Sequence, residues 1–228
     1  MNSPPTIQLR GLRKRFGRHG VLNGIDTAVA AGERVALIGQ NGAGKTTLLR
    51  CLLGQHRYEG EMRVFGLEPR RERVRVLERV GYVPQTPPPL LMTVGDLLDF
   101  SLGLNPRQTA DAVASLAGSL GIDLAGLAKH TFSRLSGGMK QKVLISLALA
   151  KAPDLLILDE PAANLDPDGR TALFAHLHAA PPHTTMLIIS HRVDEVSHLI
   201  GRVIEMDRGQ IVVDRPQGGP RLPRAREQ

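Results

Sequence analysis

One segment near the N-terminus, residues 35–53, constrains the fold of this chain more than any other. Its apolar residues 35–38 run directly into the sequence Gly39-Gln40-Asn41-Gly42-Ala43-Gly44-Lys45-Thr46, and residues 47–53 form a good helix sequence. A strand, a glycine-rich loop and a helix in this order are the pattern of a phosphate-binding loop. The glycines allow backbone N–H groups to turn inward around phosphates, the helix N-terminus adds a positive dipole, and Lys45 adds a charge. The segment therefore predicts a phosphate site, with the Thr46 hydroxyl placed to bind Mg²⁺.

Short apolar runs recur along the chain between glycine and proline residues. Continuous apolar runs lie at residues 35–38, 155–158 and 186–189. Such runs are typical of strands buried on both faces of a parallel sheet that helices cover. Further strands are predicted at residues 7–12, 25–29, 203–206 and 211–213, the last two around a hairpin turn at Asp207-Arg208-Gly209. We therefore expect an α/β fold with a mostly parallel core and an antiparallel element beside it.

The sequence changes character between Pro84 and Leu135. A Pro87-Pro88-Pro89 break precedes two segments, 94–102 and 109–120, in which apolar residues recur at helical spacing. We expect a helical insertion at about residues 86–149, inside one domain of residues 1–214. Residues 215–228 contain almost no apolar residue, so they predict a disordered basic tail.

Composition excludes several classes of protein. No apolar stretch approaches the roughly 20 residues that span a bilayer, and residues 1–6 lack a charged-then-apolar signal segment. The single cysteine, Cys51, excludes a disulfide framework or a cysteine-based zinc site within one chain. We therefore expect a protein of the reducing cytoplasm.

The net charge of +7 is unevenly distributed. Residues 1–80 carry 15 basic against 7 acidic residues, whereas residues 81–214 carry 10 against 14. The densest basic run consists of Arg70, Arg71, Arg73, Arg75 and Arg79. It is interpreted as a solvated helix face, with contact to anionic lipid headgroups or nucleic acid as the alternative. Because only 3% of the residues are aromatic and no nucleic-acid motif occurs, no nucleic-acid partner is expected.

A second motif follows the apolar run 155–158. Asp159 and Glu160 come directly after this run, at the end of the strand where α/β sheets bind ligands. Asp159 can there hold the Mg²⁺ shell, as an acidic residue does in phosphate-loop nucleotide hydrolases. Glu160 points in another direction and is better suited to polarise a water for in-line attack on a γ-phosphate. An apolar run that ends in two acids is a weak signal alone, and its pairing with the glycine-rich loop makes it strong.

A third motif, Leu-Ser-Gly-Gly-Met-Lys-Gln-Lys at residues 135–142, opens a helix. Ser136 suits the N-cap position, and Gly137 and Gly138 allow another backbone to approach closely. These residues alone leave two interpretations, a capped helix or a second anion-binding helix terminus. The order of this motif relative to the other two favours the second.

Together the motifs resemble those of the nucleotide-binding subunits of ATP-binding cassette (ABC) transporters, over about residues 6–214. Beside the glycine-rich loop, the family's motifs are matched in order by Gln85 after Gly81-Tyr82-Val83-Pro84, by the signature 135–139, by Asp159-Glu160-Pro161, by Ala163-Asn164-Leu165-Asp166, and by His191. The resemblance implies an α/β P-loop NTPase core of the RecA-like type, with a mostly parallel sheet, an antiparallel β subdomain and a helical insertion. It also implies an ATPase that uses ATP and Mg²⁺.

The resemblance assigns roles to single residues. Glu160, His191 and Gln85 act in catalysis, with His191 on the γ-phosphate and Gln85 on Mg²⁺ or the attacking water. The implied Mg²⁺ ligands are Thr46, Gln85 and Asp159. The residues implied to contact ATP are Phe16, Gly39, Asn41, Gly42, Ala43, Gly44, Lys45, Thr46, Thr47, Ser136, Gly137, Gly138 and Asp166. Phe16 matches the aromatic residue that stacks on adenine, with core packing as the alternative.

The family arrangement is a head-to-tail dimer. The signature of one chain faces the γ-phosphate that Lys45 of the other chain holds, and Asp166 resembles the residue that communicates across the dimer. ATP holds the dimer closed and hydrolysis releases it. The partner is a second copy or a related ATPase subunit. Met139 stands where many members carry Gln, and we expect activity to survive because this position contributes less to phosphate contact.

Two functions remain open. In the first, the chain is the motor of a transporter and lies at the inner face of the cell membrane, bound to a separate transmembrane permease. In the second, it is an ABC ATPase that moves no solute and drives a soluble assembly or a regulatory membrane complex. The sequence Gly138-Met139-Lys140-Gln141 resembles that of subunits paired with exporter-like permeases, and it favours a permease of that kind. The cargo is a property of the permease, so the sequence does not name it.

Overall fold

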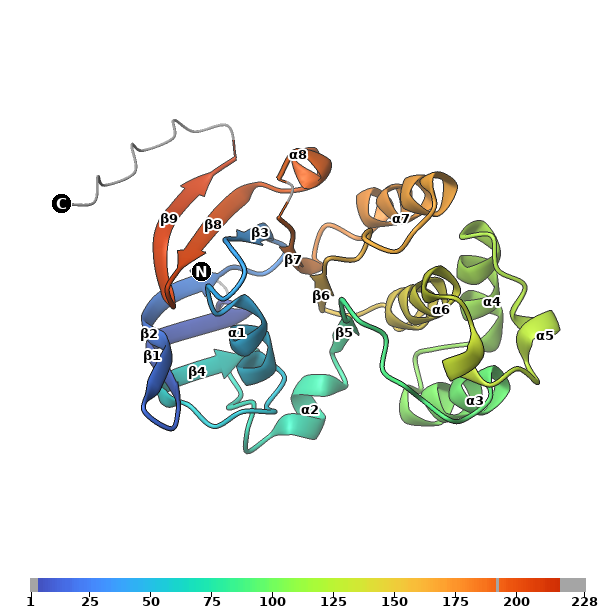
Figure 1. The fold of residues 1–228 in the computed structure, drawn as a ribbon, viewed down its shortest axis with the longest axis horizontal. Coiled ribbons are helices and arrows are strands. Elements are labelled where there is room, and N and C mark those ends of the chain that lie inside the picture. The colour runs from blue at the N-terminus through green and yellow to red at the C-terminus, as the bar shows by residue number, and fades with distance from the viewer. Residues whose placement is uncertain (1–3, 192, 218–228) are drawn as a thin grey trace. The chain divides into compact units, whose positions relative to one another are not determined.

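The computed structural model describes residues 4–191 and 193–217 (Figure 1). The chain divides into two compact units. The first combines Met1–Arg73 with Leu187–Gln228, and the second is the intervening Val74–Met186. The chain thus leaves the first unit after its N-terminal third and returns to it near strand β7 (Thr185–Ile189).

An antiparallel sheet in the order β2-β1-β4 forms one layer of the first unit. Its strands are β1 (Ile7–Phe16), β2 (His19–Val29) and β4 (Glu59–Val64). Side chains on a strand alternate between the two faces, and the apolar residues Ile7, Leu9 and Leu12 of β1 are all buried. Gly11 lies at φ +56° where the β1 register shifts, which allows a bulge between Leu9 and Leu12. The strand predicted at residues 25–29 is the C-terminal part of the longer strand β2.

The first unit also contains strands in the order β7-β3-β8-β9. Strand β3 (Arg34–Ile38) runs parallel to β8 (Arg202–Asp207), and β9 (Gln210–Pro216) pairs antiparallel with β8. The hairpin predicted at residues 207–209 is confirmed: Arg208 and Gly209 have φ values of +45° and +78°, which a tight two-residue hairpin turn requires. It belongs to the sheet that contains β3, so the antiparallel layer is built from β2, β1 and β4 instead.

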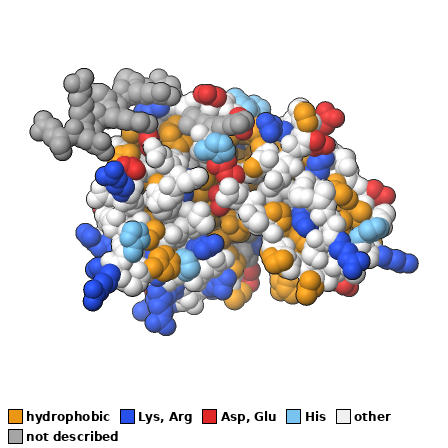
Figure 2. Space-filling view, in the orientation of Figure 1, with side chains coloured by type: hydrophobic (Ala, Val, Ile, Leu, Met, Phe, Trp, Pro, Cys, Tyr) orange, Lys and Arg blue, Asp and Glu red, His pale blue; other side chains and the backbone are white. Residues whose placement is uncertain are grey.

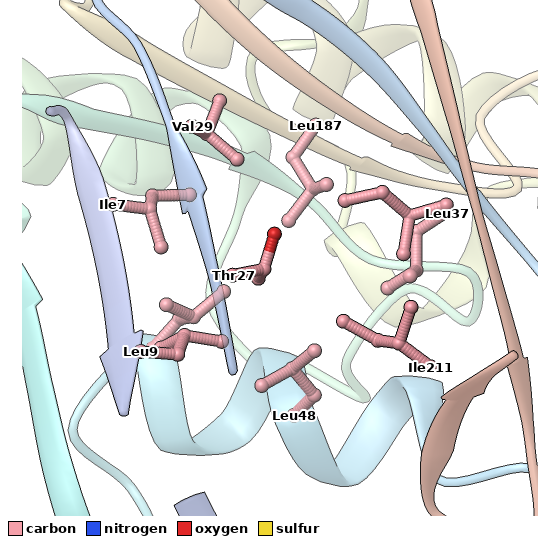
Figure 3. A pocket seen from close by; sticks show the side chains of 10 residues that line it. Ile7, Leu9, Thr27, Val29, Leu37, Leu48, Leu187 and Ile211 are labelled. Atoms are coloured by element: carbon pink, nitrogen blue, oxygen red, sulfur yellow. The ribbon is translucent and has the colours of Figure 1, made fainter. Parts of the chain in front are cut away.

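Helices α1 (Lys45–Leu52) and α8 (Val193–Val196) belong to the same unit. Aliphatic side chains from the antiparallel sheet, from α1 and from the other strands converge on a small apolar cavity (Figure 3). The labelled side chains in that view include Ile7, Val29, Leu37, Leu48 and Leu187. The Thr27 hydroxyl is the polar group among them. The cavity marks the hydrophobic core of the first unit, where the two sheets and α1 meet.

In the second unit, β5 (Val80–Val83) pairs in parallel with β6 (Leu155–Asp159). Every residue of β6 is buried, as the continuous apolar run predicts. Helix α2 (Arg73–Leu77) precedes β5, and α7 (Pro167–Ala179) follows β6. The parallel pairs β3–β8 and β5–β6 confirm the α/β prediction of a mostly parallel core.

A group of helices lies between β5 and β6 in the sequence. It consists of α3 (Val94–Leu104), α4 (Ala110–Ser119), α5 (Leu124–Leu127), the 3₁₀ turn η1 (Phe132–Arg134) and α6 (Gly137–Ala150). Thr93 and Thr109 are N-caps, and each accepts a hydrogen bond from a backbone N–H of the first turn. The helices pack around the fully buried Phe132. The assignment of about 86–149 as a separate helical subdomain stays a prediction.

Basic side chains gather at the lower left in Figure 2, over the part of the molecule that carries β1, β2 and β4 in Figure 1. In the arginine run, only residues 73–77 are helical. Arg73 donates to the carbonyl of Leu53 at 3.1 Å, and Arg79 pairs with Asp154 at 2.6 Å. Arg73 lies in α2 and is exposed, as the prediction of a solvated helix face has it, whereas Arg79 lies after the helix and is half-buried, so the prediction is wrong for Arg79.

No helix within the two described ranges is long and apolar enough to cross a membrane. The tail predicted at residues 215–228 overlaps the end of β9, which extends to Pro216. Residues 218–228 lie outside the described residues.

Candidate functional site

The glycine-rich loop joins β3 to α1 in the first unit. Gly39, Gly42 and Gly44 have φ values of +143°, +86° and +102°, a backbone region that L side chains rarely adopt. A Cβ at Gly39 would lie 2.2 Å from the carbonyl oxygen of Met206, and one at Gly44 would lie 2.9 Å from that of Val21. The glycines are therefore required both by the turn and by the close approach of β8 and β2.

A helix N-terminus and a lysine lie directly after this loop. Helix α1 begins at Lys45, so its first backbone N–H groups lack helical partners. The Lys45 ammonium folds back over the loop and donates to the carbonyls of Gly39 at 2.6 Å and Gln40 at 3.0 Å. Asn41, Gly42 and Thr46 are exposed, whereas Ala43 and Gly44 are buried and Thr47 is half-buried. This combination of a helix N-terminus, a lysine and an exposed loop suits a phosphate chain.

Phe16 ends β1 in the same unit, and its side chain is 47% exposed. Its ring and that of His56 form a T-shaped pair, with centroids 5.3 Å apart and an interplanar angle of 81°, and the Lys14 ammonium lies 4.5 Å from the Phe16 centroid. Burial, followed by the charges of Lys14 and Arg50, lowers the pKa of His56 below its ordinary value, which favours a neutral imidazole. The alternative of core packing for Phe16 is not what the structure shows, because the ring remains accessible.

His191, the predicted γ-phosphate contact, also belongs to the first unit. It lies two residues after the end of β7 and is exposed. The other seven histidines match no family motif, and the structure gives His176 of α7 a different contact, a 2.6 Å hydrogen bond with the Ser119 hydroxyl of α4.

The two acidic residues lie in the second unit, where β6 ends. Asp159 is the last residue of β6 and is only 4% exposed. Glu160 is half-buried and has a φ of +49°, which is uncommon for a residue with a side chain. The chain therefore turns sharply between the two carboxylates, which is consistent with their different predicted roles. Strained backbone of this kind is concentrated at functional sites.

Gln85 follows β5 in the second unit and is exposed. Its backbone carbonyl accepts a 3.5 Å hydrogen bond from the side-chain amide of Asn164, which belongs to the predicted motif 163–166. Two predicted motifs that are 79 residues apart in the sequence thus meet within this unit.

The signature residues begin α6. Ser136 is the N-cap, and its hydroxyl accepts from the backbone N–H of Met139 at 3.2 Å, as the sequence predicts. Ser136 and Gly137 are exposed, whereas Gly138 is half-buried. A Cβ at Gly138 would lie 2.8 Å from the carbonyl oxygen of Asn164, so this glycine is needed where the helix and the 163–166 segment approach.

Asp166 is the N-cap of α7. Its Oδ1 accepts from the backbone N–H of Gly169 at 3.1 Å and lies 2.9 Å from the Lys142 ammonium of α6. The hydrogen bond from Lys142 lowers the pKa of Asp166 below its ordinary value, so the carboxylate is ionised at neutral pH.

The predicted site residues thus form two groups. Phe16, the loop 39–47 and His191 belong to the first unit; Gln85, residues 136–138, Asp159, Glu160 and Asp166 belong to the second. Sequence reasoning missed Lys142 and Gly169, which contact Asp166 of the second group, and Gln141, which donates to the carbonyl of Pro84 beside Gln85. From the sequence, Gln141 was predicted only as one residue of a helix. In the structure it is fully buried, and a buried glutamine needs a polar partner.

The predicted Mg²⁺ ligands offer oxygen donors of the type that this ion prefers. Thr46 contributes an exposed hydroxyl, Asp159 a nearly buried carboxylate and Gln85 an exposed amide. Mg²⁺ is usually held by one or two carboxylates together with waters and substrate phosphates. The donor set therefore fits the ion.

Comparison with known proteins identifies the family to which this chain is similar. Residues 22–163 match the family model described as "ABC transporter". The sulfate/thiosulfate import ATP-binding protein CysA of Escherichia coli (strain K12) is 35% identical over 216 residues, which are 90% of this chain and 59% of that protein. The aliphatic sulfonates import ATP-binding protein SsuB 2 of Rhodococcus jostii (strain RHA1) is 37% identical over 213 residues, or 92% of this chain and 82% of that protein.

Solved structures agree with the fold. A nucleotide-free ATP-binding cassette from an ABC transporter is 26% identical and has a TM-score of 0.73, over 93% of this chain and 92% of that one. An ATP-binding subunit of an ABC transporter, 24% identical, has a TM-score of 0.82 over 92% of this chain and 90% of that one. The P-loop NTPase fold predicted from the sequence is thereby confirmed.

These comparisons also correct one expectation. The relatives named above are import proteins, so the preference for an exporter-like permease, which rested on the wording of residues 138–141, is not supported. The chain spans about 59% of the length of CysA and most of the length of SsuB 2. The matched family model covers more than half of the chain, and it includes the glycine-rich loop, the signature and both acidic residues. The chain therefore belongs to the family of ABC transporter ATP-binding subunits.

Proposed function

We propose that this chain binds and hydrolyses ATP as the motor subunit of an ABC importer. The geometry of the glycine-rich loop carries this proposal. Three glycines at positive φ, a helix that begins at Lys45 and an ammonium folded over the loop create a cradle for a phosphate chain. We further propose that residues 1–214 act as one nucleotide-binding domain with a helical subdomain at about residues 86–149.

In this proposal the first unit holds the nucleotide. The backbone N–H groups of residues 39–47 and the Lys45 ammonium bind the β- and γ-phosphates, and the exposed ring of Phe16 stacks on adenine. His191 donates a hydrogen bond to the γ-phosphate. Thr46, Asp159 and Gln85 are the residues that would hold Mg²⁺. When bound, this ion neutralises charge on the phosphate oxygens.

Glu160 is proposed as the residue that orients and polarises the attacking water. The positive φ of Glu160 changes the backbone direction after Asp159, and we expect the two carboxylates to point differently, so that one residue serves the water and the other the metal. Ser136, Gly137 and Gly138 are proposed to contact the γ-phosphate bound by a second subunit. Asp166 then lies on the face toward that subunit. The dimer is formed by two copies or with a related ATPase.

The importer is proposed from the relatives, because both are named as import proteins. An import motor needs a separate transmembrane permease, which would hold this chain at the inner face of the cell membrane. The cargo follows from the permease that binds it. The alternative of a non-transport ABC ATPase is not favoured by any observation on the described residues, and it becomes an outcome of the test below.

The test begins with the purified chain. Release of inorganic phosphate from Mg-ATP should be measurable for the wild type and absent for Lys45→Ala, with Lys129→Ala as an exposed control of the same charge change. If the wild type neither binds nor hydrolyses ATP, the proposal is wrong.

The transport assignment needs a second measurement. A tagged chain is recovered from detergent-solubilised native membranes and from cytosol, and the proteins that co-purify are identified by mass spectrometry. A multi-span permease with a substrate-binding component would support the importer. A soluble assembly partner or a single-span regulatory partner would replace that assignment and leave the ATPase in place.

A further inference from the structure

Two consecutive residues of α6, Gln141 and Lys142, contact two different loops of the second unit. Gln141 is fully buried, and its side-chain amide donates to the carbonyl of Pro84 at 3.2 Å. The Lys142 ammonium lies 2.9 Å from Oδ1 and 3.1 Å from Oδ2 of Asp166. The helix that begins with the signature therefore contacts both the segment before Gln85 and the 163–166 segment.

The backbones of these segments also touch. A Cβ at Gly138 of α6 would lie 2.8 Å from the carbonyl oxygen of Asn164, and Asn164 donates to the carbonyl of Gln85. Three segments, which contain Gln85, the signature and Asp166, thus form one contact network inside the second unit.

The pair formed by Lys142 and Asp166 differs from an ordinary surface ion pair. The Lys142 side chain is only 11% exposed, although that of Asp166 is 57% exposed. The ammonium contacts both oxygens of a carboxylate that is already fixed by capping α7. Exposed ion pairs contribute little to stability because two long side chains must be ordered to form them. In this pair, burial restricts Lys142 and capping of α7 restricts Asp166.

Gly169, in the first turn of α7, provides the space for this pair. A Cβ at this position would lie 2.5 Å from Asp166 Oδ1 and 2.7 Å from Lys142 Cε. Those atoms are the ends of side chains, so an added methyl group would displace the pair and leave the backbone of α7 in place.

We propose that Lys142 is a positioning residue, which acts through Asp166 to hold the 163–166 segment against the signature helix. This inference rests on the proposed function. If Asp166 faces a second subunit, its position affects how two subunits close around ATP. The affinity of one chain for nucleotide depends on the loop 39–47, which belongs to the first unit. Loss of the Lys142 contact should therefore reduce kcat and the cooperativity of hydrolysis, with little effect on ATP binding.

The test uses variants of the full chain. Lys142→Met keeps the length of the side chain and removes its charge, and Lys142→Arg keeps the charge. Lys140→Met is the matched control, because Lys140 lies on the same helix and contacts none of these groups among the described hydrogen bonds and ion pairs. Lys142→Met should lower kcat by about 10- to 100-fold, since small misplacements in a site have effects of that size. ATP affinity should stay within about twofold, and Lys142→Arg should restore most of kcat.

Gly169→Ala is an independent test, because it changes neither member of the ion pair. Alanine has a higher helix propensity than glycine, so an effect on helix stability alone would leave the protein as stable or more stable. A fall in kcat with an unchanged or higher Tm would therefore support displacement of the pair.

Hydrogen exchange gives a readout that needs no hydrolysis. In the nucleotide-free chain, Lys142→Met should increase exchange of the amides of residues 163–169, whereas Lys140→Met should not. If Lys142→Met has the same hydrogen exchange, kcat and Hill coefficient as the wild type, the inference is overturned and the ATPase proposal stays intact. A loss of kcat that only follows a lowered Tm would assign Lys142 a structural role and also overturn it. A wild-type chain without ATP binding would instead refute the proposed function, and exchange would still decide whether Lys142 holds the segment.

Discussion

Arg202 of β8 and Asp214 of β9 form a two-point ion pair across the hairpin, with Nε–Oδ1 and Nη2–Oδ2 distances of 2.6 Å. The same guanidinium donates to Glu33 at 3.0 Å, to the carbonyl of Ala28 and to the Thr27 hydroxyl. The hydrogen bonds that the guanidinium donates to Asp214 and Glu33 raise the pKa of Arg202 above its ordinary value. One side chain thus connects β2, β8, β9 and the turn before β3.

Replacement of this guanidinium should destabilise the first unit. Arg202→Met removes a donor from two carboxylates, a carbonyl and a hydroxyl, and we expect the free energy of unfolding to fall by about 1–3 kcal/mol. Urea denaturation followed by circular dichroism measures the change. Arg18→Met, at the exposed β1–β2 turn, is the control. Equal stability of Arg202→Met and wild type would show that the network contributes nothing.

Lys45→Ala should weaken ATP binding. The ammonium is the positive side chain nearest to the loop carbonyls of Gly39 and Gln40, and its loss removes charge-assisted contacts to phosphate. We expect affinity to fall by about 10- to 100-fold, which corresponds to one such contact. Isothermal titration calorimetry with a non-hydrolysable ATP analogue measures this. Undiminished affinity would contradict the phosphate-loop assignment.

Glu160→Gln should separate binding from hydrolysis. The amide keeps the size of the side chain and cannot act as a base, so we expect ATP binding to persist and hydrolysis to slow by about 10²- to 10⁴-fold. Light scattering with size-exclusion chromatography should then detect an ATP-dependent dimer. A variant that hydrolyses ATP at the wild-type rate would remove Glu160 from the catalytic assignment.

Cys51 should be unreactive in the folded chain. It is fully buried in α1, and burial raises the pKa of its thiol from 9.0 to about 11. Because the thiolate is the reactive form, Ellman's reagent at pH 8 should modify the unfolded chain rapidly and the folded chain slowly. The raised pKa of Cys51 stabilises the folded state below pH 9, and this stabilisation is lost as pH rises toward 11. A Cys51→Ala variant should lack that part of the pH dependence. Fast modification of the folded chain would contradict the burial.

Truncation should distinguish β9 from the residues after it. Removal of residues 218–228 leaves every described contact of β9 in place, so ATPase activity and Tm should not change. Removal of residues 210–228 also deletes β9 and the Asp214 partner of Arg202, and should lower Tm. A large loss of activity in the shorter truncation would show that residues 218–228 have a role in the reaction.

Much of the candidate site was readable from the sequence because its determinants are local. A phosphate-binding loop needs positive-φ glycines and a helix N-terminus within a few consecutive residues, and all of them lie between Gly39 and Lys45. The N-cap of α6 at Ser136 is equally local. The buried strand β6, which places Asp159 and Glu160, follows from a continuous apolar run.

Other features depend on contacts between distant parts of the chain. Gln141 reaches a carbonyl 57 residues earlier, and Arg202 reaches Thr27, 175 residues earlier. The sequence does not pair these residues with their partners, because a side chain's partner depends on which segments pack together. The sequence of residues 138–141 did not predict import either, which is the function named for the relatives.

The sequence by itself therefore determined the α/β core, the order of the nucleotide motifs and the family, because each depends on residue types at fixed short spacings. Only the tertiary structure decided that the Phe16 ring is exposed, that Arg73 and Arg79 bind neighbouring segments, and that Lys142 meets Asp166 beside Gly169. The physical reason is that exposure and ion pairing depend on the surroundings that packing creates around a side chain, which its sequence neighbours do not specify.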